Sequence, residues 1–207
     1  MVPDLGGWLF RRRTWLPLPL VVALLLFPPS RQPGALLHPS GNQPPLVLVW
    51  MGVFVVAAGE ALRLWAVHHI GVVSRTRSER LGPLITSGPF GLIRNPLYVG
   101  NVALWIGFTI SAGVLWLLPV VSLVLAFEYH AIVRWEEQLL ESRIGEPYRI
   151  YMSRVPRWVP GFRATETSAP EPSVRFSWRD TLFSERGTLV AIVVGYCLLW
   201  LKMILLE

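Results

Sequence analysis

Two short polar segments hold the residue types that could do chemistry in this apolar chain. The first, SGPFGLIRNPLYVG, occupies residues 87–100 and places prolines, glycines, an arginine and an asparagine directly before an apolar stretch. Pro96 suits the first turn of a helix, and the free amides of such a turn can hold a carboxylate or a phosphate. Gly100, in the same turn, leaves room for a bulky group. By itself the segment is equally consistent with a plain Pro/Gly turn at the entrance to a membrane.

The second segment is RWEEQLLESRIGEPYRIYMSRVPRWVPGF, residues 134–162, and it contains the adjacent acids Glu136 and Glu137. Neighbouring residues on a helix project about 100° apart, so one carboxylate can face a cavity while the other faces solvent or an arginine. Paired acids suit general acid/base chemistry. A single carboxylate that accepts hydrogen bonds from a ribose or an amine is an equal alternative, and a solvated helix end is the third.

The composition indicates that these segments are positioned by a membrane-embedded helix bundle. The chain has 207 residues, of which 53% are hydrophobic and 15% charged, and its mean hydropathy is +0.48. Soluble domains are nearer to a quarter charged. The net charge of +6 comes almost entirely from arginine, but no basic helix or aromatic RNA-binding signature accompanies it, so we expect no nucleic-acid partner. The single cysteine, Cys197, excludes an intramolecular disulfide and a cysteine zinc site, and we expect no metal site.

The apolar windows predict an all-α, polytopic membrane helix bundle with about five transmembrane helices. The first window has a basic flank, but we expect a retained helix rather than a cleaved signal peptide. The expected spans are residues 15–29, 46–67, two within 97–133 separated by a break at 111–119, and 188–206. The expected organisation is an N-terminal helix and loop (1–44), a membrane domain (45–162), a polar linker (163–187) and a C-terminal transmembrane helix (188–207).

Arginine counts predict the orientation of the bundle. With the N-terminus inside, Arg11 to Arg13 and the polar segments 68–96 and 134–187 all lie on the cytoplasmic side, which follows the positive-inside tendency. Both chemistry-bearing segments then share one face, where they can form one site. We therefore expect an integral protein of the cell's inner (plasma) membrane with its site facing the cytoplasm and its C-terminus outside. Within the second span, Glu60 and Arg63 are spaced to pair on one helix face.

The two motifs together resemble the isoprenylcysteine carboxyl methyltransferase family, which belongs to a wider group with the membrane phospholipid methyltransferases. The family pattern is roughly T-S-G-P-Y-x-x-x-R-H-P-x-Y-x-G, then, after a hydrophobic hairpin, E-E-x-x-L-x-x-x-F-G-x-x-Y-x-x-Y-x-x-x-V-P. Residues 86–100 and 136–160 resemble these in the same order, and the resemblance covers about residues 45–162. It implies an enzyme, a methyltransferase that uses S-adenosyl-L-methionine bound in a cytoplasmic pocket and acts on a membrane lipid or a prenylated acceptor.

The resemblance also implies which residues bind the cofactor. They are Gly82, Pro83, Leu84, Ile85, Phe90, Asn95, Pro96, Leu97, Tyr98 and Glu136. Phe90 stands at the usual tyrosine and Asn95 at the usual histidine, and Glu136 matches the family's acidic cofactor ligand.

One position departs from the pattern in a way that concerns the acceptor. The eukaryotic enzymes carry, four residues before the first glutamate, an arginine linked to the prenylcysteine carboxylate, and here that residue is Ile132. The nearest arginine, Arg134, is therefore the candidate for binding the substrate. No residue is assigned as catalytic, because a sulfonium methyl donor reacts with an acceptor that is aligned and desolvated.

Two alternative functions remain open on the sequence. Some sterol reductases share a related Arg-His-Asn-Tyr-Gly motif and bind a nicotinamide cofactor, so a membrane sterol or isoprenoid reductase is one alternative. The other is a non-catalytic lipid-binding scaffold, because the histidine and the acceptor arginine of the family are absent. The paired glutamates and the segment YRIYMSRVPRW favour the methyltransferase. Ligand binding separates the three.

Overall fold

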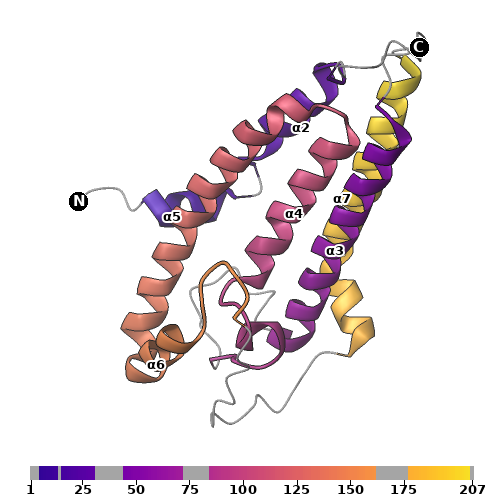
Figure 1. Ribbon diagram of the computed structural model, residues 1–207. Coiled ribbons are helices and arrows are strands. Elements are labelled where there is room, and N and C mark those ends of the chain that lie inside the picture. The colour runs from indigo at the N-terminus through magenta and orange to yellow at the C-terminus, as the bar shows by residue number, and fades with distance from the viewer. Residues whose placement is uncertain (1–4, 14, 31–43, 72–83, 162–176, 206–207) are drawn as a thin grey trace.

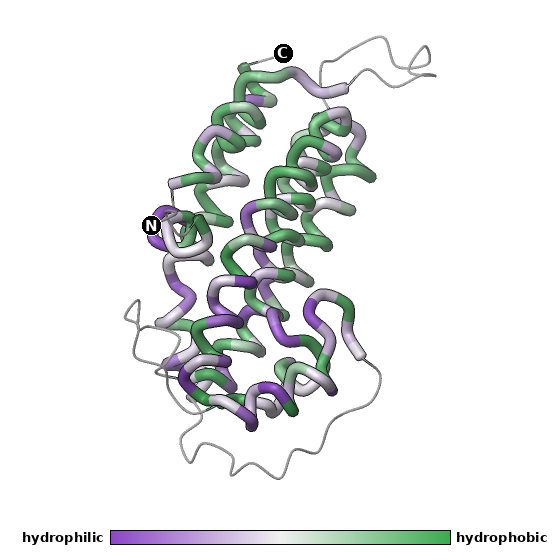
Figure 2. The backbone as a smooth tube through the Cα atoms, turned by 90° about the vertical axis from the view of Figure 1, so that its left-hand side faces the viewer, coloured by the Kyte–Doolittle hydropathy of each residue, from purple (hydrophilic) through white to green (hydrophobic). Residues whose placement is uncertain are grey.

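The computed structural model describes residues 5–13, 15–30, 44–71, 84–161 and 177–205, and in these ranges the chain is helical and contains no strand. The elements are α1 (Leu5–Arg12), α2 (Leu18–Leu26), α3 (Leu46–Ile70), η3 (Gly88–Gly91, a 3-10 turn), α4 (Pro96–Ser111), η4 (Leu115–Leu117, a 3-10 turn), α5 (Leu118–Ile144), α6 (Glu146–Arg154) and α7 (Trp178–Leu205). Figure 1 shows α3, α4, α5 and α7 as long, roughly aligned helices, with α6 at the lower end. Hydrophobic residues line these helices, and hydrophilic residues gather at that lower end (Figure 2).

Three helical segments among the described residues are long and apolar enough to cross a membrane. They are α3, the combined segment Leu115–Ile144, and α7. Helix α4 is apolar but has 16 residues, which corresponds to about 24 Å. The predicted first span contains only the nine-residue helix α2, about 13 Å long. The all-helical membrane architecture is confirmed, whereas the predicted count of five spans is not.

Helices α3 and α4 form the most extensive contact between two described elements. Small residues make this contact possible, since a Cβ atom on Gly100 would lie 2.8 Å from the carbonyl oxygen of Gly59 and 2.5 Å from Cγ of Arg63. Small residues allow membrane helices to approach each other closely. Gly100 was expected to leave room for a bulky group, and the group beside it is Arg63 on α3.

The predicted helical hairpin is confirmed. Helix α4 ends at Ser111, a short turn follows, and α5 begins at Leu118. Gly113 adopts a positive φ of 71° in the turn, a conformation that glycine allows. Ser30 ties the turn to the chain after α2, because its amide donates to the carbonyl of Gly113 at 2.8 Å and its hydroxyl accepts from the amide of Leu115 at 3.0 Å.

Helix α7 begins ten residues before the expected start of the last span, at Trp178 rather than residue 188. Ser177 caps it, since its hydroxyl accepts from the amide of Asp180 at 3.1 Å and donates to that residue's carboxylate at 2.7 Å. The ring of Trp178 stacks on His68, with 4.3 Å between centroids, and so joins α7 to the end of α3. Residues 178–187 are therefore helical and continuous with the expected last span, while the linker composition at 164–173 lies outside the described residues.

The opposite end of α7 is attached to α2. Lys202, the only lysine of the chain, is buried, and its ammonium donates to the carbonyls of Leu24 and Phe27 at 2.6 Å each. These carbonyls lie at the C-terminus of α2, where helix carbonyls lack partners within the helix. Helix α1, unlike α2, packs against α5. The ring centroids of Phe10 on α1 and Trp135 on α5 are 5.1 Å apart.

Candidate functional site

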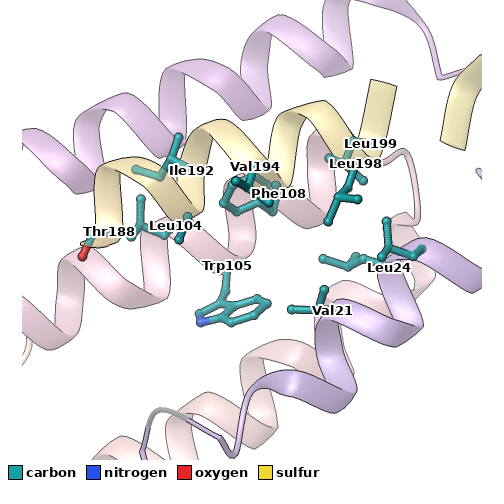
Figure 3. Close-up of a pocket in the computed structure, with 13 residues that line it drawn as sticks. Val21, Leu24, Leu104, Trp105, Phe108, Thr188, Ile192, Val194, Leu198 and Leu199 are labelled. Atoms are coloured by element: carbon teal, nitrogen blue, oxygen red, sulfur yellow. The ribbon is translucent and has the colours of Figure 1, made fainter. Parts of the chain in front are cut away.

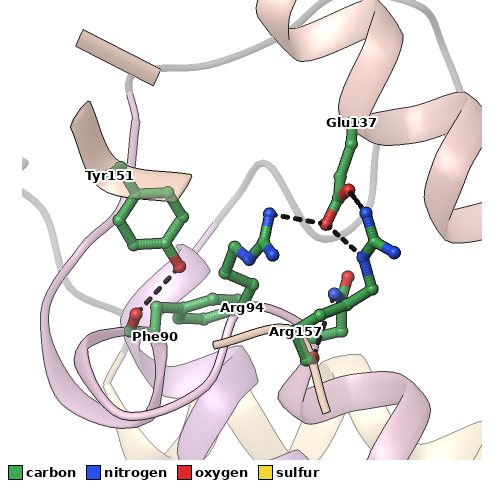
Figure 4. Close-up of polar contacts among 6 residues, drawn as sticks. Phe90, Arg94, Glu137, Tyr151 and Arg157 are labelled. Carbon is green, nitrogen blue, oxygen red and sulfur yellow. Dashed lines mark hydrogen bonds and ion pairs between the residues drawn. The ribbon is translucent and has the colours of Figure 1, made fainter. Parts of the chain in front are cut away.

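The loop before α4 is braced by the segment that includes α6 and the residues after it. The hydroxyl of Tyr151 donates to the carbonyl of Phe90 at 2.8 Å, as Figure 4 shows. Burial raises the pKa of Tyr151 well above its usual value, so this hydroxyl keeps its proton and remains a donor. Two backbone bonds follow along the loop, from the amide of Arg94 to the carbonyl of Pro156 at 2.9 Å and from the amide of Gly161 to the carbonyl of Leu92 at 2.8 Å. The two sequence motifs thus meet and are bonded to each other.

Glu137 is the buried carboxylate that joins the two motifs by charge. It forms an ion pair with Arg94 at 3.0 Å and a bidentate pair with Arg157, in which Nε lies 3.1 Å from the carboxylate (Figure 4). Hydrogen bonding to Glu137 raises the pKa of Arg157 above its usual value. One carboxylate thus serves two guanidinium groups, and the cluster carries one positive charge in excess. We name Arg94, Glu137 and Arg157 the loop clamp.

Glu136 points to a different set of partners, as expected for adjacent helical residues. Its carboxylate interacts electrostatically with the Tyr98 hydroxyl and with the guanidinium of Arg13. Arg13 in turn approaches the same hydroxyl, at 3.5 Å. The ring of Tyr98 packs on Tyr129, with 5.1 Å between centroids. Glu136 and Tyr98, predicted as site residues from separate motifs, are therefore brought together, and the end of α1 joins them.

The N-terminus of α4 keeps backbone donors available. Asn95 occupies the N-cap position, but its side chain makes no capping bond to the first turn. Its amide group donates instead to the carbonyl of Arg157 at 3.3 Å. Pro96, at the first helical position, is fully buried and has no amide proton to satisfy. The first turn of α4 thus presents uncapped amides beside Arg94, which is the arrangement that holds an anion.

The apolar residues predicted for the site pack mainly against neighbouring helices. Ile85 and Phe90 are buried against Ala66 of α3, and Leu97 packs at the edge of this cluster. Leu84 packs instead beside the tyrosines of α6. These residues position the loop in the structure, while Gly82 and Pro83 lie outside the described residues.

Arg134 is separated from Glu136 by the geometry of α5. Residues two apart on a helix project to nearly opposite sides, and Arg134 is exposed whereas Ile132 is fully buried in the main core. The structure therefore does not bring Arg134 and Glu136 together on one face. Ile132, four residues before Glu136, contributes to packing at the position where the eukaryotic enzymes carry an arginine.

A second polar cluster lies within the helix bundle. The expected pairing of Glu60 with Arg63 is present, with 3.4 Å between Arg63 Nε and the carboxylate. Arg63 also donates to Asn101 on α4 and to Glu185 and Thr188 on α7, the last at 3.1 Å. We name Glu60, Arg63, Asn101, Glu185 and Thr188 the bundle cluster. It contains two carboxylates and one guanidinium, which is one negative charge in excess.

Sequence reasoning missed Arg13, Arg157 and Glu185. Glu185 was missed because residues 163–187 were assigned to a linker, although the spacing of Ser177 and Asp180 is a helix-start signal that could have extended α7. Arg13 was interpreted only as a marker of membrane orientation. Arg157 carried no local signal, since its partner Glu137 lies 20 residues away in the sequence.

Two cavities border α7. One, about 330 Å³ in volume, lies between α2, α4 and α7, where apolar side chains such as Trp105, Phe108 and Leu199 surround it and Thr188 marks one end (Figure 3). The other, about 380 Å³, lies between α3 and α7 and has Glu60 in its wall. Neither is lined by the residues predicted to bind the cofactor.

Two curated proteins are similar to this chain. The cobalt-zinc-cadmium resistance protein CzcN of Cupriavidus metallidurans is 31% identical over 140 residues, which cover 68% of this chain and 58% of that protein. The nickel-cobalt-cadmium resistance protein NccN of Alcaligenes xylosoxydans xylosoxydans is 30% identical over 113 residues, 55% of this chain and 50% of the relative. The chain thus spans between 50% and 58% of the length of these relatives. No solved structure matches it significantly.

The family match covers the first motif and the beginning of the second. Residues 47–146 match the phospholipid methyltransferase family. This range contains the loop before α4 and the two glutamates of α5. It leaves out α1, α2, α7 and all but the first residue of α6. Over these residues, which are just under half of the chain, the protein is similar to the phospholipid methyltransferase family.

Proposed function

We propose that the protein is an S-adenosyl-L-methionine-dependent methyltransferase that acts on a lipidic or prenylated acceptor at the cytoplasmic face of the membrane. The observation that carries the proposal is the meeting of the two motifs: the clamped loop places Tyr98 beside Glu136, and the family match includes these two residues. The same family match favours a methyltransferase over a nicotinamide-dependent reductase. The three membrane-length helices support access to an acceptor from the bilayer.

The residues around the loop suit the charges of this cofactor. Arg94 Nε is buried and, among the described residues, has no hydrogen-bond partner. With the uncapped amides of α4 it forms a set of donors for the carboxylate of the cofactor. Glu136 offers an acceptor for its amine or ribose hydroxyls. The loop clamp's excess positive charge and the negative charge of Glu136 therefore match the two ends of a zwitterion.

When bound, S-adenosyl-L-methionine supplies a methyl group on a positively charged sulfur. The chain's own part is to bind, orient and exclude water. The loop clamp holds the loop before the ligand arrives, which lowers the ordering cost of binding. The aromatic pair Tyr98 and Tyr129 and the apolar residues Ile85 and Phe90 keep water away from the loop. An acceptor oxygen or nitrogen then needs only alignment with the methyl group.

The test is calorimetric binding to the purified protein in nanodiscs. Wild type is expected to bind S-adenosyl-L-methionine, and Glu136→Ala to bind it about ten- to a hundredfold more weakly, since a hydrogen bond to a charged group contributes about 1.5–3 kcal/mol. Glu141→Ala is the matched control, because Glu141 lies on the same helix but pairs with exposed Arg149. Equal affinity of wild type and Glu136→Ala contradicts the assignment, and binding of a reduced nicotinamide instead of the methyl donor favours the reductase.

The names of the two relatives suggest a setting for this activity. Both are called metal resistance proteins. A methyl ester on a lipid carboxylate removes a negative charge from the membrane surface, and such charges attract cations. We infer that methylation by this protein lowers the binding of divalent cations to the membrane. Cells that express the wild type should then bind less cadmium at their surface than cells that express Glu136→Ala, and equal binding overturns this link.

A further inference from the structure

One carboxylate of the bundle cluster, that of Glu60, accepts no hydrogen bond from the described residues. Arg63 directs its two terminal nitrogens to Asn101, Glu185 and Thr188. Only its Nε faces Glu60, at 3.4 Å, and neither oxygen of Glu60 accepts a hydrogen bond from any described residue. Glu60 is nevertheless 95% buried, since its exposed fraction is 5%. A buried carboxylate without hydrogen bonds is costly, so its retention points to a ligand.

A ligand of Glu60 can bind in the cavity between α3 and α7, because Glu60 lines its wall. Its volume is about 380 Å³, and Glu60 is the only charged residue among those that line it. The rest of the wall is apolar or aromatic, for example Val56, Leu64 and Ile192. The volume lies at the lower end of the range for small-molecule sites. One acidic group in an apolar wall selects a ligand with one donor or positive charge on an apolar body.

The charge balance favours a cation over a neutral donor. The bundle cluster has two carboxylates for one guanidinium, so a single positive charge neutralises it. A divalent metal is disfavoured, because no group of three His, Cys, Asp or Glu side chains that could hold a metal ion is found among the described residues. The complementary ligand is a monovalent ammonium.

The depth of Glu60 restricts the ligand further. Glu60 lies ten residues before the end of α3 at Ile70, which is about 15 Å along the helix axis. With the end of α3 placed at the membrane surface, a hydrocarbon core about 30 Å thick puts this carboxylate well below the level of lipid phosphates. The ammonium group of an aminophospholipid, held at the surface by its phosphate, does not reach it. An amine attached directly to an apolar chain does.

We propose that the cavity between α3 and α7 binds a lipophilic amine without a phosphate group, whose ammonium donates to Glu60. The site is separate from the loop before α4. It includes α7, which lies outside the family match. It does not rest on the proposed methyl transfer, and its test measures binding rather than activity.

The experiment is equilibrium dialysis of radiolabelled octylamine against the full chain in phosphatidylcholine nanodiscs, with empty nanodiscs subtracted. Wild type is expected to bind about one equivalent. Glu60→Gln, which keeps the size of the side chain and removes its charge, should weaken binding at least tenfold. Glu128→Gln is the matched control, since Glu128 is equally buried and also has an oxygen without a partner, but does not line this cavity. It should bind octylamine like the wild type.

Three further measurements test the proposal even if Glu60→Gln folds poorly. Octanol should bind wild type at least tenfold more weakly than octylamine, and Ala61→Leu, which fills the cavity wall, should abolish binding. Replacing phosphatidylcholine with phosphatidylethanolamine should not displace octylamine. Equal binding by Glu60→Gln and wild type, or equal binding of octanol and octylamine, overturns the proposal. Displacement by phosphatidylethanolamine also overturns it, because the source is then a phospholipid head group.

Discussion

The loop clamp and the bundle cluster are built from the same residue types in opposite proportions. At the polar end, Glu137 serves Arg94 and Arg157. Inside the bundle, Arg63 serves Glu60 and Glu185. The first arrangement satisfies its carboxylate fully and fixes a loop, whereas the second leaves a carboxylate without hydrogen bonds at the edge of a cavity. A buried ion cluster can therefore either stabilise the fold or bind a ligand. Here the cluster with excess positive charge fixes a loop, and the cluster with excess negative charge leaves a carboxylate available to a ligand.

The largest effect is expected for Glu137→Ala, which breaks the loop clamp. The change leaves Arg94, whose side chain is 13% exposed, without its partner, and removal of one member of a buried pair costs about 3–5 kcal/mol. Thermal unfolding in detergent should show this loss, and the affinity for S-adenosyl-L-methionine should fall with it. Unfolding at the wild-type temperature would show that the clamp is not structural.

Gly100→Leu should have the next largest effect, because it forces α3 and α4 apart beside the bundle cluster. The first side-chain atom would already lie 2.8 Å from the carbonyl oxygen of Gly59, and overpacking of this kind costs about 1–3 kcal/mol. Gly187→Leu on α7 is the control, since nothing lies within 4 Å of a Cβ atom there. Gly100→Leu should lower the unfolding temperature and Gly187→Leu should leave it unchanged. A normally stable Gly100→Leu that fails to bind the cofactor would instead place a ligand at Gly100.

Tyr151→Phe tests the loop brace without touching its charges. The change removes the donor to the carbonyl of Phe90, a buried bond of 2.8 Å, and should cost about 1 kcal/mol. Hydrogen exchange at the amides of residues 90–94 should become faster, because the loop opens locally. Ser153→Ala, which removes a hydroxyl that bonds within its own helix, should leave exchange in the loop unchanged. Unchanged exchange in Tyr151→Phe would mean that the backbone bonds alone hold the loop.

The smallest effect is expected for Asn95→His. Asn95 donates one hydrogen bond to the carbonyl of Arg157 at 3.3 Å, and a neutral imidazole can donate the same bond. Affinity for S-adenosyl-L-methionine should therefore remain within a few-fold of wild type. Any pH dependence that the change adds should fall between about pH 5 and 8, where histidine titrates. Loss of binding at all pH values contradicts the equivalence of the two side chains.

The sequence predicted the parts of the fold that depend on local patterns. The hairpin break at 111–119, the start of α4 at Pro96 and the divergence of Glu136 and Glu137 follow from proline positions and helical periodicity. These features need no knowledge of the partner helix. The Glu60–Arg63 pair was also predictable, because both residues belong to one helix face.

The features that could not be predicted depend on contacts between distant segments. Local periodicity does not say that Arg157 reaches Glu137, that Glu185 joins Arg63, or that Gly100 faces α3. The N-terminal region shows a further limit, because apolar composition over residues 15–29 predicted a span and the structure has only the short helix α2. Proline residues at its start and just beyond its end confine this helix.

The buried ammonium of Lys202 turns the chain's only lysine into a chemical reporter. Reagents that acylate amines need a free, accessible nitrogen, and this one is enclosed between α7 and the end of α2. Acylation of Lys202 is therefore slow while α7 stays packed on α2. The rate of acylation then reports how often the two helices separate. Because the signal comes from one position, mass spectrometry of a single peptide can follow the opening of the bundle under any ligand or lipid condition.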